Sequence, residues 1–148
     1  MDYSKEPLLS ISIVLYKNDK NQFTQLIESL CRVKTTCIVY FIDNSPDNRL
    51  SQLIPNKENY HYHWSNDNLG YGKGHNLAIE KTIDSGKYHL TMNGDVYFNE
   101  GTLERIISYM NQNTDIGLLL PRVLNPDKTE QPLYKLLPKP QGLILRRF

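Results

Sequence analysis

Short apolar runs alternate with helical segments from residue 10 to residue 120, and this alternation constrains the fold most. The runs are rich in β-branched and aromatic residues, which is typical of strands, and most of them have the apolar character of strands buried on both faces. We expect five strands, at 10–16, 37–42, 60–64, 88–92 and 116–120. Strands that alternate with helices predict an α/β, Rossmann-like, mostly parallel sheet with helices on both faces.

The helical segments carry their own start signals. Asp19 is a predicted N-cap, and apolar residues follow it at helical spacing from Phe23 to Val33. A second helix is expected after the glycine-rich segment, ending near Gly86, and a third after Asn99. Asn125-Pro126-Asp127-Lys128 predicts a turn.

Composition limits the class of protein. The 148 residues predict a single domain, 1–148, and the formal charge of +1 gives no general attraction to nucleic acid. Cys31 and Cys37 lack metal-binding spacing and suit a reducing compartment. No apolar run approaches the length of about 18 residues that a spanning helix needs. The N-terminus shows no apolar signal segment, so we expect a cytoplasmic protein, with peripheral contact at the inner membrane face left open.

Asn93-Gly94-Asp95 ends the run at 88–92 and allows two interpretations. Asn-Gly between apolar runs is a strong signal for a two-residue hairpin. Alternatively, a carboxylate at the carboxyl end of a parallel strand can hold a hard divalent cation together with phosphate oxygens. The residues alone leave both interpretations open.

Asp43 stands at the end of the second predicted strand. A carboxylate there can accept hydrogen bonds from a ribose or a base, or it can simply cap the polar turn that follows. His61 and His63 would share one face of the third strand and are interpreted as ordinary strand residues, because no further metal ligand is evident nearby.

The segment from Ser65 to Asn76 contains three glycines, at positions 70, 72 and 74. A glycine-rich loop that leads into a helix can bind an anion. The segment is neither a Walker loop nor a dinucleotide fingerprint, so taken alone it is a weak signal.

Three stretches together resemble the family-two glycosyltransferases of GT-A fold, especially rhamnosyltransferase-like members that build bacterial surface polysaccharides. They are Ser12-Ile13-Val14-Leu15-Tyr16-Lys17-Asn18, then Ile42-Asp43-Asn44-Ser45, and then Asn68 to Asn76 followed by Asn93-Gly94-Asp95. The resemblance covers roughly residues 10–125 and corresponds to the nucleotide-binding half of the fold.

The resemblance implies a role for each matching position. Asp43 would hydrogen-bond the base of a nucleoside-diphosphate sugar, and Asp95 would hold a manganese or magnesium ion on the donor diphosphate. The other implied donor-binding residues are Tyr16, Asn68, Gly70, His75 and Asn76. The implied partners are that sugar nucleotide and a glycan or lipid-linked acceptor.

The departures from the family pattern also matter. Asn93 replaces the first aspartate of the family's Asp-X-Asp motif, which removes one negative charge from the metal site. Lys17 stands where asparagine is usual, and His75 where many members have arginine. A histidine at this position can still donate a hydrogen bond to a phosphate, but without the fixed bidentate fork of arginine. The acceptor half and its catalytic carboxylate have no counterpart here, so the catalytic residue is unknown.

The residues and the family resemblance together suggest four candidate functions. The first is the donor-binding half of a glycosyltransferase, and the second is a non-catalytic nucleotide-binding or interaction module. A sugar-nucleotide nucleotidyltransferase ranks low because the expected glycine-rich basic loop after the first strand is absent. A flavodoxin-like regulator ranks low because no acidic cluster stands at the first strand.

Overall fold

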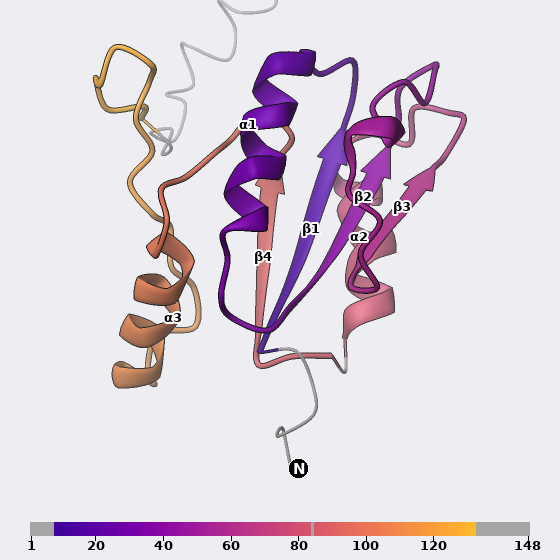
Figure 1. Ribbon diagram of the computed structural model, residues 1–148. Coiled ribbons are helices and arrows are strands. Elements are labelled where there is room, and N and C mark those ends of the chain that lie inside the picture. Colours follow the sequence, from indigo (N-terminus) through magenta and orange to yellow (C-terminus); the bar gives the residue numbers. More distant parts are fainter. Residues whose placement is uncertain (1–7, 84, 133–148) are drawn as a thin grey trace, which may run out of the picture. The chain divides into compact units, whose positions relative to one another are not determined.

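The computed structural model describes residues 8–83 and 85–132. Along the chain the elements are β1 (Leu9–Leu15), α1 (Lys20–Cys31), β2 (Cys37–Asp43), the 3-10 turn η1 (Ser51–Leu53), β3 (Tyr60–Trp64), α2 (Tyr71–Thr82), β4 (Tyr88–Asn93) and α3 (Thr102–Gln112) (Figure 1). Two compact units divide the chain, Met1–Ser108 and Tyr109–Phe148. The prediction of one domain over 1–148 stays a prediction.

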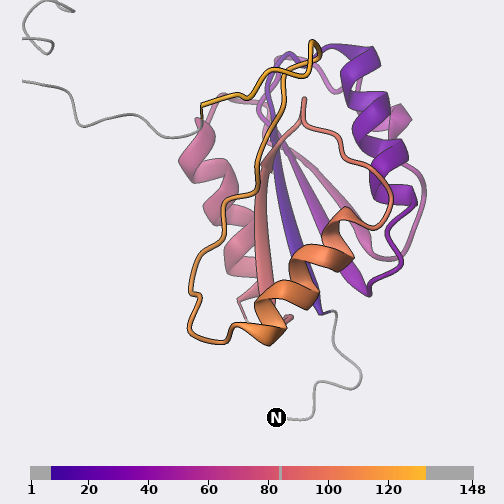
Figure 2. The same cartoon turned by 90° about the vertical axis from the view of Figure 1, so that its left-hand side faces the viewer.

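The first unit contains a four-stranded sheet in the order β3-β2-β1-β4, and every neighbouring pair is parallel. The predicted α/β, Rossmann-like fold is confirmed. No strand follows the turn, because residues 96–99 form no regular structure and the next element is α3, so Asn93-Gly94 is not the tip of a hairpin. That alternative is wrong, and the turn instead leads from the carboxyl end of β4 toward α3. Figure 2 views the sheet from the β4 edge.

One face of the sheet packs against α1. All seven residues of β1 are buried, and Ile11, Ile13 and Leu15 point into a core that also contains Phe23 and Phe41. Leu103 and Ile107 of α3 belong to the same core. The helix α1 begins where it was predicted to begin, since the Asp19 carboxylate accepts hydrogen bonds from the backbone N–H groups of Asn21 and Gln22.

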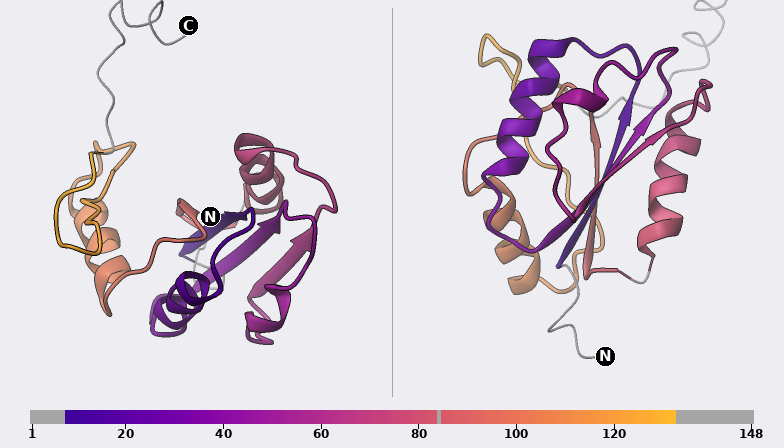
Figure 3. Two further views of the ribbon diagram at one scale, coloured as in Figure 1. Left: turned by 90° about the horizontal axis from the view of Figure 1, so that it is seen from above. Right: turned by 45° about the vertical axis from the view of Figure 1, so that its right-hand side comes forward.

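The other face packs against α2, so that helices cover both sides of the sheet (Figure 3). Its apolar contacts are few, with Val14, Ile42 and Ala78 forming a small buried cluster. The β1 residues that share this face with Val14 are Ser10 and Ser12, and both are buried. This face is therefore partly polar inside.

The second unit contradicts one prediction. Residues 116–120 form no strand, and the Leu118 side chain is 88% exposed. An apolar run becomes a strand only when its N–H and C=O groups find a ladder partner, and none of the described residues supplies one to this run. The turn at 125–128 is confirmed, because Lys128 N–H donates to Asn125 O at 2.9 Å. Among the described helices, none is long and apolar enough to cross a membrane.

Candidate functional site

The carboxyl ends of β1, β2 and β4 meet at one edge of the sheet. In the register, Leu15 pairs with Asp43, and Val14 pairs with both Ile42 and Asn93. Asp43 and the Asn93-Gly94-Asp95 turn therefore lie on either side of the end of β1. Tyr16 follows directly and is 47% exposed. In open α/β sheets this is the edge where ligands bind.

Asp43 is fully buried, and both of its carboxylate oxygens accept hydrogen bonds. Oδ1 accepts the Ser45 N–H at 2.9 Å, and Oδ2 accepts the Tyr62 hydroxyl at 2.8 Å. Burial and the hydrogen bond to Asp43 raise the pKa of Tyr62 above its ordinary value. Asp43 thus caps its turn, as one of the two interpretations expected. Each carboxylate oxygen keeps a second lone pair, so contact with a base or a ribose stays a prediction.

The glycine-rich segment follows β3 and leads into α2, and hydrogen bonds tie it to the loop after β2. Asn44 Nδ2 donates to Gly70 O at 3.2 Å, and Asn68 Oδ1 accepts the Gly70 N–H at 3.0 Å. Gly70 has a φ of 79°, in the left-handed region that favours glycine. A Cβ atom on Gly74 would lie 2.8 Å from Val14 Cγ2, so this glycine lets α2 approach β1 closely. Asn76 is exposed on α2.

His75 points into the interior between α2 and the sheet. Its Nδ1 lies 2.8 Å from Ser12 Oγ, which lies 2.9 Å from His89 Nε2, and Ser10 Oγ is 2.8 Å from His89 Nδ1. Burial, with a smaller contribution from His89, lowers the pKa of His75 to about 4. The imidazole is therefore neutral near pH 7.

The other ring nitrogen of His75, Nε2, differs from Nδ1 in its hydrogen bonding. His75 Nε2 is buried and has no hydrogen-bond partner among the described residues. The Tyr71 ring packs edge-on against the imidazole, with the ring centroids 4.3 Å apart. Contact between His75 and a phosphate stays a prediction, and it requires the atoms that cover Nε2 to move.

Asp95 is exposed beside the end of β4. The preceding Gly94 is packed tightly, because a Cβ atom there would lie 2.4 Å from Leu15 Cδ2 and 3.0 Å from Asn18 Nδ2. Burial and the negative charge of Asp95 both raise the pKa of Tyr71, so Asp95 lies within electrostatic reach of the first residue of α2. The turn and the start of α2 therefore border the same region.

These residues fit a divalent cation only in part. Within the described ranges, no group of three or more His, Cys, Asp or Glu side chains could hold a metal ion. Asp95 offers one carboxylate, and Asn93 at most a neutral oxygen. Hard divalent ions accept water and phosphate oxygens as further ligands. The arrangement suits an ion that arrives with a diphosphate.

Sequence reasoning missed three residues near this site. Tyr62 was assigned only to a strand, Ser12 only to the first strand and the stretch around it, and Tyr71 only to the glycine-rich segment before a helix. Their partners depend on the register between strands and on the packing of α2. The Ser-Ile-Ser-Ile alternation in β1 was the one available signal for a polar face beneath a helix.

Comparison with known proteins decides the family. The family model "Glycosyl transferase family 2" matches residues 10–147. The chain belongs to glycosyl transferase family 2. Family membership agrees with the parallel sheet and with the GT-A fold suggested by the sequence.

This glycosyltransferase-family chain matches only part of two curated relatives. It is 28% identical over 141 residues to the "Low-salt glycan biosynthesis hexosyltransferase Agl10" of Haloferax volcanii, covering 93% of this chain and 43% of the relative. It is 30% identical over 93 residues to an uncharacterized protein of Haemophilus influenzae, covering 57% of this chain and 49% of the relative. The chain spans less than half the length of either curated relative.

A solved structure supports the fold. The crystal structure of S. aureus TarS superposes with a TM-score of 0.57 at 20% identity, over 72% of this chain and 20% of TarS. At this level of identity the likeness concerns the GT-A fold alone.

Proposed function

We propose that the chain is the donor-binding part of a glycosyltransferase that transfers a hexosyl group from a nucleoside-diphosphate sugar to a hydroxyl acceptor. One observation carries the proposal. In a chain of this family, Asp43 and the Asn93-Gly94-Asp95 turn lie on either side of Leu15 at the carboxyl edge of the sheet. A nucleotide along this edge would have its base near Asp43 and its diphosphate near Asp95.

The proposed roles follow from the side chains. Asp95 would be the protein's single carboxylate ligand to Mn²⁺ or Mg²⁺, and such an ion, when bound, offsets the negative charge of a departing diphosphate. Asp43 would accept a hydrogen bond from the base or the ribose. Asn68 and Gly70 would hold the loop, and Asn76 and Tyr16 would border the nucleotide.

The acceptor is proposed to be a growing glycan or a lipid-linked sugar in polysaccharide synthesis. The name of the Haloferax relative refers to glycan biosynthesis, which supports this acceptor class. A cytoplasmic position, peripheral to a membrane that carries such acceptors, accords with the proposal. No general base is assigned.

A non-catalytic nucleotide-binding or interaction module is the second candidate. The observation that favours it is the state of Asp43, whose two oxygens are both hydrogen-bonded and whose side chain is fully buried. A carboxylate in this state can hold the β2 turn and β3 together without contacting a nucleotide.

Calorimetry with uridine and thymidine diphosphates, in manganese and in chelator, tests the proposal. We expect the Asp95→Ala substitution to abolish the metal-dependent part of binding. We expect the Asp43→Asn and Asp43→Ala substitutions to weaken binding in both buffers, by about 1–3 kcal/mol. Glu28→Ala, on the exposed side of α1, is the matched control. Equal affinity in manganese and in chelator would remove the metal from the proposal, and no binding to either nucleotide would favour an interaction module that binds no nucleotide.

A further inference from the structure

Four side chains beneath α2, the relay, form a continuous row of hydrogen-bond contacts. Ser10 Oγ lies 2.8 Å from His89 Nδ1 and also donates to Tyr88 O at 3.3 Å. Ser12 Oγ lies 2.9 Å from His89 Nε2 and 2.8 Å from His75 Nδ1. His89 is exposed on β4, whereas the other three members are buried. The relay ends on His75 Nε2, which is buried and has no partner among the described residues.

The two imidazoles of the relay are neutral above pH 7, because burial lowers the pKa of His75 and of His89. A neutral imidazole has one N–H donor and one acceptor nitrogen, and a serine hydroxyl has one hydrogen to donate. Each contact along the relay therefore fixes the direction of the next one. Only two arrangements of the hydrogens fit all three contacts with the rings.

In the first arrangement every contact of the relay carries a hydrogen. The Ser10 hydroxyl donates to Tyr88 O and accepts His89 Nδ1–H. The Ser12 hydroxyl donates to His89 Nε2 and accepts His75 Nδ1–H. His75 Nε2 then carries a lone pair and no hydrogen.

The second arrangement reverses every hydrogen bond to the rings. The Ser10 hydroxyl must then donate to His89 Nδ1, so its contact with Tyr88 O loses its hydrogen. At the other end, His75 Nε2–H is buried without an acceptor. Orphaned buried N–H groups are rarer than acceptors with an unused lone pair. The first arrangement has one hydrogen bond more and leaves no buried donor unpaired, so His75 Nε2 is an acceptor.

Tyr71 controls access to this acceptor. Its ring packs edge-on against the imidazole of His75, and its side chain is 55% exposed. Tyr71 stands between Gly70 and Gly72, and a Cβ atom on either glycine would meet nothing within 4 Å. An outward rotation of Tyr71 in this open space would uncover the imidazole. The start of α2 borders the same region as the Asn93-Gly94-Asp95 turn, so the uncovered side would face the proposed donor.

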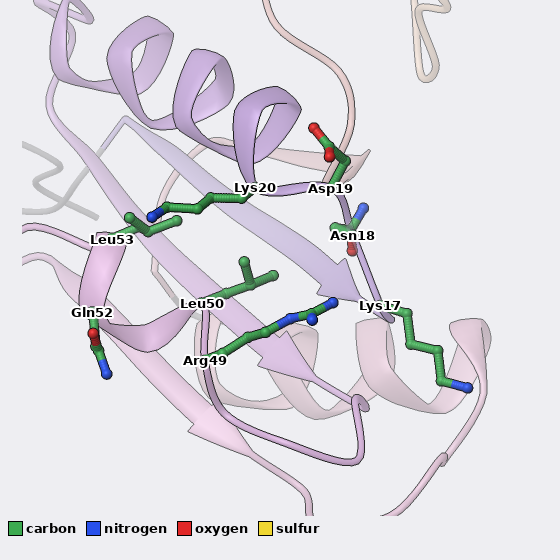
Figure 4. A pocket seen from close by; sticks show the side chains of 8 residues that line it. All are labelled: Lys17, Asn18, Asp19, Lys20, Arg49, Leu50, Gln52 and Leu53. Carbon is green, nitrogen blue, oxygen red and sulfur yellow. The ribbon is translucent and has the colours of Figure 1, made fainter.

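A hollow of about 620 Å³ between the start of α1 and η1 is a weaker candidate for a ligand site (Figure 4). The amino group of Lys20 lies beside Leu53, whereas the guanidinium of Arg49 points toward Lys17. The carboxylate of Asp19 also lines the hollow. Its charged groups therefore do not converge on one ligand, in contrast to the single directed acceptor of the relay.

We propose that His75 Nε2 accepts a hydrogen bond from a sugar hydroxyl of the bound nucleotide, and that Ser10, His89 and Ser12 are positioning residues that keep it an acceptor. The inference rests on the proposed function. A ribose or hexose hydroxyl has the hydrogen that the Nε2 lone pair needs. The oxygens of a metal-bound diphosphate carry no hydrogen at pH 7.5 and would be repelled. The ligand of His75 thus differs from the phosphate that the family resemblance implies.

The first arm of the test determines the tautomer without any ligand. The chain is labelled with ¹⁵N-histidine, and two-bond proton–nitrogen correlations are recorded at pH 7.5. Signals are assigned with His75→Gln and His89→Gln. We expect the hydrogen of each imidazole on Nδ1 and a bare Nε2. A hydrogen on Nε2 of His75 would overturn the proposal.

A matched pair of variants at the exposed end tests the positioning role. His89→Glu supplies only acceptors to Ser12, so His75 should keep its hydrogen on Nδ1. His89→Lys supplies only donors, so the Ser12 hydroxyl should turn to His75 Nδ1 and move the hydrogen of His75 to Nε2. His63→Lys adds the same charge at an exposed position on β3 and should change nothing. The same tautomer of His75 in both His89 variants would overturn the positioning role.

The second arm adds magnesium with uridine or thymidine diphosphate, each with and without an attached glucose. We expect the ¹⁵N signal of His75 Nε2 to shift saturably while the nitrogen stays unprotonated. A shift with the diphosphate alone supports a ribose hydroxyl, and a shift only with the glucose-bearing nucleotide supports a hexose hydroxyl. A hydrogen that appears on Nε2 on binding would indicate a phosphate, and saturable binding without any shift would mean no contact. Either result would overturn the proposal.

The affinities of the two variants give a result opposite to simple electrostatics. By charge alone, His89→Lys should bind an anionic nucleotide more tightly than His89→Glu. We expect it to bind roughly three- to tenfold more weakly, because it removes one neutral hydrogen bond from His75 to the ligand. Tighter binding by His89→Lys would overturn the proposal.

Failure of the proposed function would look different. A wild-type chain that binds neither nucleotide would contradict the donor site and the hydroxyl ligand together. The first arm needs no nucleotide, so it still decides whether the relay holds His75 Nε2 as an acceptor. Nucleotide binding with no response of His75 would contradict the hydroxyl contact and leave the donor site standing.

Discussion

The Tyr62 hydroxyl donates a hydrogen bond to Asp43 Oδ2 at 2.8 Å and links β3 to the end of β2. Asp43 is fully buried, so this hydrogen bond and the one from Ser45 replace the water that a carboxylate would otherwise bind. The residue that is proposed to contact a nucleotide is therefore also a structural element of the sheet edge.

We expect the Tyr62→Phe substitution to lower the free energy of unfolding by about 1.5–3 kcal/mol, because it removes one hydrogen bond to a buried charged group. Urea denaturation at pH 7.5 measures the change. Tyr97→Phe, at a side chain that is 51% exposed, should have almost no effect. An unchanged midpoint for Tyr62→Phe would mean that Asp43 finds its stabilisation elsewhere.

Gly74 and Gly72 form a matched pair on α2. A Cβ atom at Gly74 would meet Val14 Cγ2 at 2.8 Å, whereas at Gly72 it would meet nothing within 4 Å. We expect Gly74→Ala to destabilise the protein by about 1–3 kcal/mol, since Val14 is buried and β-branched and cannot easily turn aside. Gly72→Ala should be neutral or stabilising by up to about 1 kcal/mol, because alanine favours helix.

The same denaturation measurement compares the two variants. A Gly74→Ala protein as stable as Gly72→Ala would contradict the close approach of α2 to β1.

The histidines beneath α2 predict a loss of stability in mild acid. The folded pKa of His75 is lowered to about 4 from an ordinary value of 6.5, and burial lowers the pKa of His89 as well. Below pH 6.5, His75 becomes protonated in the unfolded chain, whereas in the folded chain it stays neutral until about pH 4. The free energy of unfolding should therefore be highest above pH 6.5 and fall between pH 6.5 and pH 4, by about 2–3 kcal/mol for His75.

Urea denaturation across that pH range, with wild type and His75→Gln, tests this expectation. His75→Gln should reduce the slope, and His63→Gln, at an exposed position on β3, should leave it unchanged. An equal slope in wild type and His75→Gln would show that other groups cause the acid sensitivity.

The sequence was sufficient for the first four strands, because each combines β-branched or aromatic residues with a polar loop at its end. The sequence also predicted Asp19 as a helix cap, and it predicted that Asp43 and Asp95 lie at the same carboxyl edge of the sheet. It was not sufficient for residues 116–120, because an apolar run says nothing about whether a pairing strand exists. The Tyr62–Asp43 bond likewise depends on the register of β2 and β3, which no local pattern determines.

His75 shows the same limit from another direction. The resemblance to a family suggests a phosphate ligand at this position, whereas the packing of α2 on Ser12 turns the imidazole inward. Whether a side chain faces a ligand or the interior depends on which face of the helix meets the sheet. Gly74 sets that face by its close approach to Val14.

Manganese-induced broadening of backbone amide signals tests the central claim most directly, because it reports where the ion binds. With uridine diphosphate present, we predict that low manganese concentrations broaden Gly94, Asp95 and Val96 first, and that Asp95→Ala abolishes this pattern. Without nucleotide the same signals should broaden only weakly, since one carboxylate supplies too little charge. Broadening centred away from the end of β4, or equally strong without nucleotide, would contradict a donor site built on Asp95.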